Sequence, residues 1–320
     1  MNIYFFGLHP NERKRIENEI DVDKLEFYEE SINKVDSEKY KDCDVLCICT
    51  KSTITRDILD NCPNLKYIVT RSTGMDHIDL AACREKGIRV RNLKEYGARS
   101  VAEFEMGMML DLTRKISEAK RTPEKNDFRK RELRGIDLYD KTLGIVGLGR
   151  IGGLVSNYAE AFGMNVLAYD KSTENISLNY SSLEEIIEDS DIISINVPLN
   201  NETRHMFNDE MFNNMKDGVL IINTSRGEVI DTDALIRALE SGKVAGCALD
   251  VVEGEAAIKH NDTSTEDNIR NINNYKKLLE MPNVLITPHN AFNTEEAIDR
   301  LFEETITTIN KIIIDSLDVE

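Results

Sequence analysis

Residues 142–163 read TLGIVGLGRIGGLVSNYAEAFG, and this stretch decides the fold. An apolar run is followed by Gly147-x-Gly149-x-x-Gly152 and then by apolar residues at helical spacing. In such a strand–turn–helix, the first glycine permits a tight turn and the second lets the backbone approach a pyrophosphate. The third lets the helix pack closely on the strand, and the helix N-terminus faces the anion. The stretch predicts a dinucleotide-binding turn; the alternative is a purely structural glycine turn.

An acidic residue follows at the spacing that this motif requires. The next apolar run, 165–170, reads NVLAYD and ends in Asp170, close to the expected interval of about 20 residues. A carboxylate there accepts hydrogen bonds from ribose hydroxyls and repels the additional phosphate of NADP. The sequence therefore predicts NAD as the cofactor; the alternative is a solvated aspartate.

Short β-branched runs alternate with charged segments of helical pattern over most of the chain. This alternation predicts an α/β fold of parallel sheets covered by helices on both faces. The glycine turn lies near the middle of the chain, so two domains are expected, with a substrate domain preceding the cofactor domain. The strands expected before the turn region are 3–6, 45–50, 67–70 and 88–91. Those expected in the second unit are 142–147, 165–170, 191–197, 218–224, 245–251 and 283–288.

Three segments of the chain lie outside this alternation of strands and helices. A long helix is expected over 100–120, begun by a capping box of Ser100 and Glu103. The interval 258–280 reads as a long polar connection that ends in a short helix. A strongly amphipathic helix over 294–314 closes the chain and need not belong to the second unit.

Composition argues against several classes of partner. The 320 residues include 58 acidic and 40 basic side chains, a net charge of −18, and a polyanion repels nucleic acids and anionic membranes. Neither a signal peptide nor an apolar run of about 18 residues is apparent, so a cytoplasmic protein is expected. The six cysteines form no C-x-x-C pair. Buried thiols are therefore expected and no metal site.

Three strands of the second unit are followed by polar residues of complementary chemistry: Arg226, Glu255 and His289. The carboxyl ends of parallel strands meet at one edge of the sheet, where the dinucleotide binds. Arginine offers a planar cation to a carboxylate or carbonyl, and histidine exchanges protons near neutral pH. A nearby carboxylate favours imidazolium. Each residue alone could be a turn, surface or capping residue, and Glu253 competes with Glu255 for the acidic role.

Six segments together resemble the D-isomer-specific 2-hydroxyacid dehydrogenases, and the resemblance covers nearly the whole chain. In order, they are RSTGMDHIDL, YGARSVAEFEMGMMLDLTR, KTLGIVGLGRIG, VPLNNETRHMFN, INTSRGEVIDTDAL and NVLITPHNAF. The resemblance implies that Arg226, Glu255 and His289 are catalytic. His289 would exchange the proton of the substrate hydroxyl, Glu255 would favour imidazolium, and Arg226 would hold the substrate carboxylate and carbonyl.

The resemblance also implies a domain organisation. Residues 1–95 would form a flavodoxin-like substrate domain completed by the C-terminal helix, 293–320. Residues 96–292 would form the NAD-binding Rossmann domain, with a cleft between the two. A homodimer would form through the cofactor domain and the helix near Ser100, although the apolar residues of that helix suit an intramolecular core equally well. The cofactor-binding residues expected are Gly147, Gly149, Arg150, Ile151, Gly152, Asp170, Val197, Pro198, Thr203, Thr224, Ser225 and Asp250.

The substrate is expected to be a small 2-oxo or 2-hydroxy acid. The run VEGE before Ala256 looks like the D-lactate dehydrogenase branch. Thr73 and Gly74 would bind the substrate carboxylate, and Tyr96 and Phe292 match aromatic positions near the substrate. Glyoxylate or hydroxypyruvate reduction and short 3-phosphoglycerate dehydrogenases are the alternatives. An alternative of another class is an NAD-sensing binding protein related to the corepressors of this family.

Overall fold

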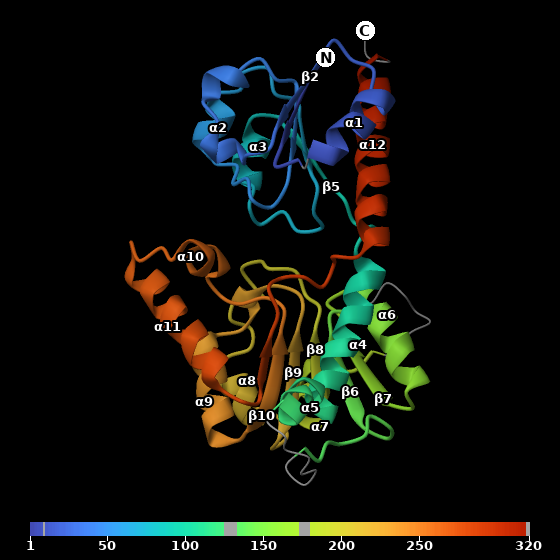
Figure 1. Ribbon diagram of the computed structural model, residues 1–320, viewed down its shortest axis with the longest axis vertical. Helices are drawn as coiled ribbons and strands as arrows, with labels where there is room; N and C mark the ends of the chain where they lie inside the picture. Colours follow the sequence, from blue (N-terminus) through green and yellow to red (C-terminus); the bar gives the residue numbers. More distant parts are fainter. Residues whose placement is uncertain (9, 125–132, 173–179, 318–320) are drawn as a thin grey trace. The chain divides into compact units, whose positions relative to one another are not determined.

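The computed structural model describes residues 1–8, 10–124, 133–172 and 180–317. It divides into two compact units, shown in Figure 1. Unit 1 comprises Met1–Gly97 and Asn293–Glu320, and unit 2 comprises Ala98–Phe292. Each unit consists of a parallel sheet and its own helices.

Unit 1 contains a five-stranded parallel sheet in the order β2-β1-β3-β4-β5. This is the strand order of flavodoxin-like folds, as the resemblance implied. Strand β2 was not among the expected strands; it lies at the sheet edge and is half-buried along its length. The strands are β1 (Asn2–Phe6), β2 (Lys24–Tyr28), β3 (Val45–Ile48), β4 (Tyr67–Thr70) and β5 (Arg89–Asn92).

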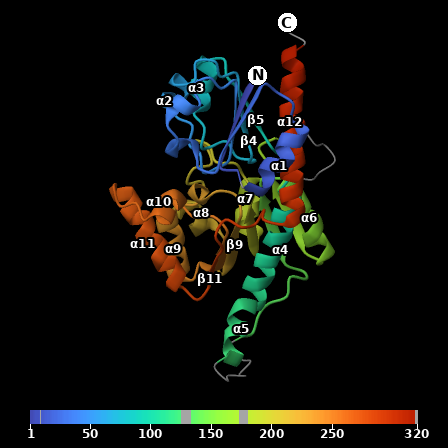
Figure 2. The same cartoon turned by 45° about the horizontal axis from the view of Figure 1, so that its top comes forward.

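Helices cover both faces of this sheet. One face, formed by Tyr4, Leu46 and Ile68 among others, packs against α2 and α3. The C-terminal helix α12 contacts β4 and lies beside α1, as Figures 1 and 2 both show. The closing helix of the chain therefore belongs to the first unit, not the second. The helices are α1 (Pro10–Glu19), α2 (Arg56–Asp60), α3 (Leu80–Glu85) and α12 (Glu295–Leu317), with 3₁₀ turns at Ile32–Lys34 and Ser37–Lys39.

Unit 2 contains all six strands that were expected in it, as a parallel sheet in the order β11-β10-β9-β8-β6-β7. The chain moves from β6 to β7 on one side and then returns to β8 on the other. The carboxyl ends of the paired strands β6 and β8 therefore form the switch point at which doubly wound sheets bind dinucleotides. The strands are β6 (Thr142–Val146), β7 (Asn165–Tyr169), β8 (Ile192–Ile195), β9 (Val219–Asn223), β10 (Val244–Leu249) and β11 (Val284–Ile286).

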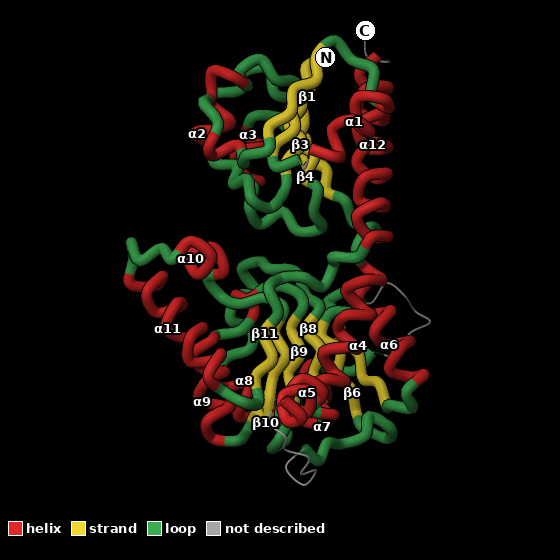
Figure 3. Tube along the Cα trace, viewed as in Figure 1, coloured by secondary structure: helices red, strands yellow, loops and turns green. Residues whose placement is uncertain are grey.

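Apolar side chains alternate between the two faces of this sheet, and each face has its own set of helices, drawn in red in Figure 3. Helices α4 and α6 pack on the face that includes Leu143, Ile192 and Ile222. Helices α7, α8, α9 and α11 pack on the opposite face. The helices are α4 (Ala98–Arg114), α5 (Ile116–Glu124), α6 (Arg150–Ala161), α7 (Leu183–Asp189), α8 (Asp209–Asn214), α9 (Thr232–Ser241), α10 (Glu255–His260) and α11 (Glu266–Glu280), with a 3₁₀ turn at Gly227–Val229.

The expected helix over 100–120 is two helices, α4 and α5. Lys115 has a φ of 52° and separates them, because the Thr113 carbonyl accepts a hydrogen bond from the Ile136 N–H instead of continuing the helix. The proposed capping box was also wrong: α4 begins at Ala98, and Ser100 is buried inside its first turns. Likewise, the interval 258–280 holds the second half of α10 and the whole of α11. Of the helices described, none is long and apolar enough to span a bilayer.

Candidate active site

The glycine turn after β6 has the backbone geometry that its sequence predicts. Gly147 has a φ of 102°, and a Cβ there would lie 2.6 Å from the Asn196 carbonyl oxygen. A Cβ on Gly152 would lie 2.1 Å from the Gly147 carbonyl oxygen. Gly149, the N-cap of α6, faces open space instead. Close packing thus requires glycine at Gly147 and Gly152. Gly149 instead leaves room in front of the N-terminus of α6, where Arg150 and Ile151 form the first turn.

Asp170 follows β7 and is bonded to the glycine turn. Its Oδ2 accepts from the Leu148 N–H at 2.8 Å, and its Oδ1 accepts from the Ser172 N–H at 2.9 Å. An ionised carboxylate has about four acceptor positions, so these two bonds fix its orientation and leave acceptor capacity for ribose hydroxyls. Asp170 can therefore both hold the turn and contact a cofactor.

The segment after β8 is closed by Thr203. Its hydroxyl donates to the Pro198 carbonyl at 2.6 Å and accepts from the Asn200 N–H at 2.9 Å. Val197 and Pro198 thereby form the start of a short closed loop next to the switch point. Thr203, expected to bind cofactor, shapes this loop in the structure.

Arg226, Glu255 and His289 follow β9, β10 and β11, which are adjacent strands of the sheet. The His289 Nδ1 lies 3.0 Å from Glu255 Oε2 and 3.2 Å from Oε1. The side chains of His289 and Glu255 are 33% and 24% exposed, so the pair is shielded but reachable from solvent. All three residues are predicted from the sequence, and the structure places two of them, His289 and Glu255, in direct contact.

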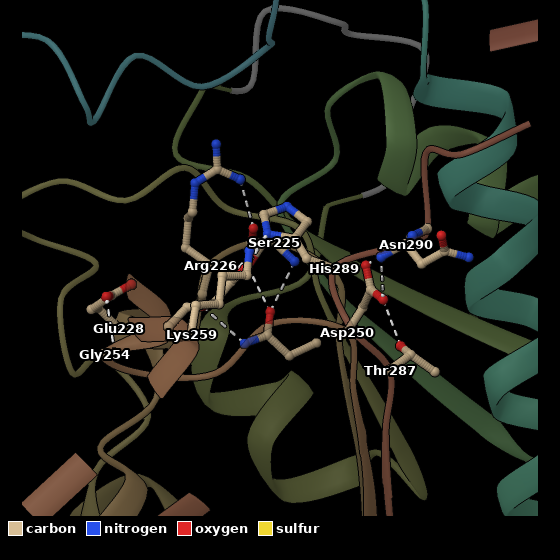
Figure 4. Close-up of polar contacts among 12 residues, drawn as sticks. Ser225, Arg226, Glu228, Asp250, Gly254, Lys259, Thr287, His289 and Asn290 are labelled. Atoms are coloured by element: carbon tan, nitrogen blue, oxygen red, sulfur yellow. Dashed lines mark hydrogen bonds and ion pairs between the residues drawn. The ribbon is translucent and has the colours of Figure 1, made fainter. Parts of the chain in front are cut away.

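Asp250 holds the loop that carries His289, as Figure 4 shows. Its carboxylate accepts from the Thr287 hydroxyl and from the backbone N–H groups of Asn290 and Ala291, at 2.5, 2.9 and 2.9 Å. The His289 N–H donates to the Asp250 carbonyl at 2.8 Å, and His289 has a φ of 56°. Asp250 was expected to bind cofactor. In the structure its hydrogen bonds fix the backbone at His289.

The ionisation of Glu255 is controlled by its surroundings. Burial opposes the charged form, but hydrogen bonds and charges from His289 and Lys259 outweigh it and lower the pKa of Glu255 to about 2. Glu255 is therefore ionised at neutral pH. Lys259, one turn along α10, was missed from the sequence, although Glu and Lys four residues apart on a helix are a recognisable pair.

Arg226 is presented by a network of bonds around Asn223. The Asn223 amide donates to the Arg226 carbonyl at 2.9 Å and accepts from the Ser225 N–H and hydroxyl. The Arg226 Nη1 donates to the Ser225 carbonyl at 2.7 Å. A Cβ on Gly227 would lie 2.0 Å from the carbonyl carbon of Val252. The loop after β9 is therefore packed directly on the loop after β10.

Glu253, the competing acid, has other partners. Its carboxylate contacts His205 Nε2 at 2.7 Å and accepts from the Thr232 hydroxyl at 2.9 Å. No contact between Glu253 and His289 is found among the described residues. The structure thus supplies the distinction between Glu253 and Glu255 that residue type alone left open.

The expected substrate-binding residues Thr73, Gly74 and Tyr96 belong to unit 1. Thr73 and Gly74 follow β4, and the loop is tied by bonds from Ser72 Oγ to the Gly74 carbonyl and from Asn92 Nδ2 to the Thr73 carbonyl. Tyr96 is buried, and its carbonyl accepts from Arg300 Nε. Phe292, half-buried, is the last residue of unit 2. Within the described ranges, no group of three or more Cys, His, Asp or Glu is arranged to hold a metal ion.

Comparison with known proteins identifies the family. The model of the NAD-binding domain of the D-isomer-specific 2-hydroxyacid dehydrogenases matches residues 106–291. A hydroxypyruvate reductase of Thermotoga maritima is 39% identical over 292 residues, covering 90% of this chain and 91% of the relative. An aromatic 2-oxoacid reductase of Clostridium sporogenes is 40% identical over 279 residues, covering 85% and 83%.

A solved structure agrees. The crystal structure of D-lactate dehydrogenase from Aquifex aeolicus, complexed with NAD and lactic acid, has a TM-score of 0.89 to this chain at 35% identity, covering 99% of this chain and 97% of the other. The chain belongs to the D-isomer-specific 2-hydroxyacid dehydrogenase family. It is an NAD-dependent oxidoreductase.

Proposed function

We propose that this enzyme interconverts a small D-2-hydroxy acid and its 2-oxo acid, with D-lactate and pyruvate as the first pair to test. The observation that carries the proposal is the 3.0 Å contact between His289 and Glu255 beside the strand end that presents Arg226. A proton-exchanging ring, an anion that favours its charged form and a planar cation are what carbonyl reduction of a 2-oxo acid requires.

Each residue of the site is proposed to have a separate role in the reaction. The nicotinamide cofactor supplies the hydride in reduction and accepts it in oxidation. His289 gives a proton to the carbonyl oxygen in reduction and takes it from the hydroxyl in oxidation. Arg226 holds the substrate carboxylate and polarises the carbonyl. Glu255 stabilises the protonated ring and, with Asp250, fixes its orientation. The glycine turn, Asp170 and the loops containing Pro198 and Ser225 are proposed to hold the cofactor.

The proposed substrate has a short, uncharged side chain. The backbone at Thr73 and Gly74 is proposed to bind the carboxylate, and the aromatic rings of Tyr96 and of Phe292 are each proposed to favour an apolar side chain. The likeness to a D-lactate dehydrogenase that binds lactic acid supports this choice. The hydroxypyruvate reductase relative supports a slightly more polar acid as the second candidate. The family's corepressors remain the alternative of another class.

The test is NADH consumption across a panel of 2-oxo acids: pyruvate, glyoxylate, hydroxypyruvate, phosphohydroxypyruvate and 2-oxoisocaproate. Turnover that collapses in His289→Ala establishes the dehydrogenase and ranks its substrates. Highest kcat/KM on pyruvate supports the lactate assignment, and highest kcat/KM on hydroxypyruvate transfers it to the second candidate. Tight NADH binding without turnover on any member would contradict the proposal and favour a sensor.

We further propose a division of labour between the units and a homodimer in the cytoplasm. Unit 1 would bind the substrate and unit 2 the cofactor. Four apolar residues of α4 suited an interface; of these, Met108 and Met109 are buried in the core of unit 2, and Phe104 and Leu112 are half-buried. A dimer through this helix would therefore use Phe104 and Leu112, with exposed apolar residues of unit 2 such as Ile116. Light scattering on the purified protein measures its mass directly.

Removing the charge at Asp170 is expected to relax cofactor preference. Asp170→Asn keeps an acceptor for the Leu148 N–H but no longer repels the additional phosphate of NADPH. The ratio of kcat/KM for NADH over NADPH should fall by about tenfold or more, which corresponds to about 1.4 kcal/mol. Asp189→Asn, exposed at the end of α7, is the control and should leave the ratio unchanged. An unaltered ratio in Asp170→Asn would remove Asp170 from the cofactor site.

The two candidate acids can be separated by their pH profiles. With a pKa of about 2, Glu255 is charged throughout the neutral range and favours the protonated ring of His289. In Glu255→Gln, the pH at which reductive turnover is half lost should move down by about one unit or more. Glu253→Gln, whose partners are His205 and Thr232, should leave that pH unchanged. The reverse pattern would assign the role to Glu253.

A further inference from the structure

A fully buried carboxyl group, that of Glu105, lies beneath the cofactor edge of the unit 2 sheet. Glu105 is on α4, with an exposed fraction of 0%, among the apolar residues Ala102, Met106 and Met109. It is not one of the residues that sequence reasoning assigned to catalysis or cofactor binding. A buried charge is costly unless it has partners, so its surroundings require an explanation.

The partners of Glu105 come from the ends of two strands. Ser194 in β8 donates its hydroxyl to Oε1, and Thr224, directly after β9, donates its hydroxyl to Oε2 at 3.0 Å. Alternation along the strands explains the placement, because both residues lie on the face of Ile192 and Ile222 that α4 covers. Thr224 immediately precedes Ser225 and Arg226. Glu105 therefore ties α4 to the segment that presents the proposed catalytic arginine.

The cluster has one acceptor more than its donors can satisfy. Asn196, just after β8, donates its amide N–H to the Ser194 hydroxyl at 2.5 Å. Its Oδ1 is buried without a hydrogen-bond partner. A proton on Glu105 would give this cluster one more donor. The cluster thus has two consistent states, one with an ionised and one with a neutral carboxyl group.

The ionisation of Glu105 lies in the physiological range. Burial raises the pKa of Glu105 to about 7 against hydrogen bonds from Ser194, Thr224 and Asn196, which lower it. Those partners are uncharged, and the α6 residues in the same core are apolar. The charged and titratable groups at this edge of the sheet are carried by the neighbouring segments: Arg150 at the start of α6, Asp170 after β7, Arg226 after β9, Asp250, Glu253 and Glu255 after β10, and His289 after β11.

The cofactor has a charge difference that such a group can sense. A dinucleotide spans the switch point between β6 and β8. Asp170 follows β7, so the ribose it binds would lie on the β6–β7 side and the nicotinamide on the β8–β9 side. The oxidised ring is positively charged and the reduced ring is neutral. An ionised carboxyl group beneath the ends of β8 and β9 favours the oxidised ring, and a neutral one removes that preference.

We propose that Glu105 is a proton-linked positioning residue of the cofactor site, which is ionised when the oxidised nucleotide is bound and takes up a proton from solvent when the reduced nucleotide is bound. This inference rests on the proposed function only in placing the nicotinamide over the ends of β8 and β9. It makes the relative affinity for the two cofactor forms depend on pH, independently of His289.

The test is titration calorimetry of NAD⁺ and NADH in buffers of different ionisation enthalpy, which counts the protons exchanged on binding. His289→Ala is the background, so that the imidazole cannot contribute. Near pH 7, NADH binding should take up roughly one proton more than NAD⁺ binding. Adding Glu105→Gln should abolish this difference. Adding Glu103→Gln, an exposed carboxylate on the same helix, should preserve it.

A difference that persists in Glu105→Gln, or no difference with Glu105 present, would overturn the inference. If Glu105→Gln fails to fold, the infrared difference spectrum between the two complexes of the His289→Ala protein decides the question. A carboxylic-acid band that appears only with NADH supports the inference, and no such band contradicts it. Failure of the proposed function would appear differently, as absent turnover on every 2-oxo acid, because these binding measurements need no substrate.

Discussion

Replacing His289 with alanine is expected to reduce turnover by about a thousandfold or more, within the range that a positioned general acid supplies. The reason is local: no other described proton-exchanging ring contacts Glu255. NADH affinity should change little, since the glycine turn lies on another part of the sheet edge. Single-turnover rates and NADH fluorescence titration measure the two effects separately.

His260→Ala is the matched control. His260 is exposed at the end of α10, in the same unit and on the same helix as Glu255. It should retain the turnover of the unaltered protein. Comparable losses in both variants, or near-normal turnover in His289→Ala, would remove His289 from the chemistry.

Replacing Arg226 with glutamine is expected to lower kcat/KM for the 2-oxo acid by about a hundredfold to a thousandfold, the usual cost of losing a charge-stabilising group. Asn223 anchors the backbone carbonyl at this position and not the guanidinium, so the loop should keep its fold. Arg226→Lys should recover little of the lost kcat/KM, because an ammonium group cannot form the two parallel hydrogen bonds of a planar guanidinium. Steady-state kinetics at several substrate concentrations gives the size of the loss.

Arg237→Gln serves as the control for Arg226. Its guanidinium forms an exposed pair with Asp209, away from the strand ends, and an exposed pair contributes roughly 0–1 kcal/mol. Its kcat/KM should stay within about twofold of the unaltered protein. If Arg226→Gln behaves like this control, the substrate carboxylate is held by another cation.

The second unit could be predicted from sequence because its signals are local. Each of its six strands is an apolar run, and the close contacts of Gly147 and Gly152 explain why glycines are needed there. Strand β2 was missed because Lys24 and Glu26 interrupt its apolar pattern, which an edge strand tolerates. The break between α4 and α5 depends on a bond from Ile136 to Thr113. That bond joins residues distant in sequence and leaves no local pattern.

The candidate site was predictable in its residue types but not in its supporting contacts. Arg226, Glu255 and His289 follow apolar runs that are recognisable as strands, so their positions at the strand ends can be predicted from the sequence. The role of Asp250 could not be inferred, because its bonds to the loop at 287–291 require the neighbouring positions of β10 and β11. Glu105 was missed for the same reason: only the packing of α4 on the sheet brings Ser194 and Thr224 to its carboxyl group.

The most direct test of the central claim follows the hydride and the configuration of the product. The unaltered protein would reduce its best 2-oxo acid with NADH deuterated at C4, and the product would be analysed by NMR and chiral chromatography. Deuterium at C2 of the D-2-hydroxy acid is the predicted result. A product without deuterium at C2, or with the L configuration, would contradict the account.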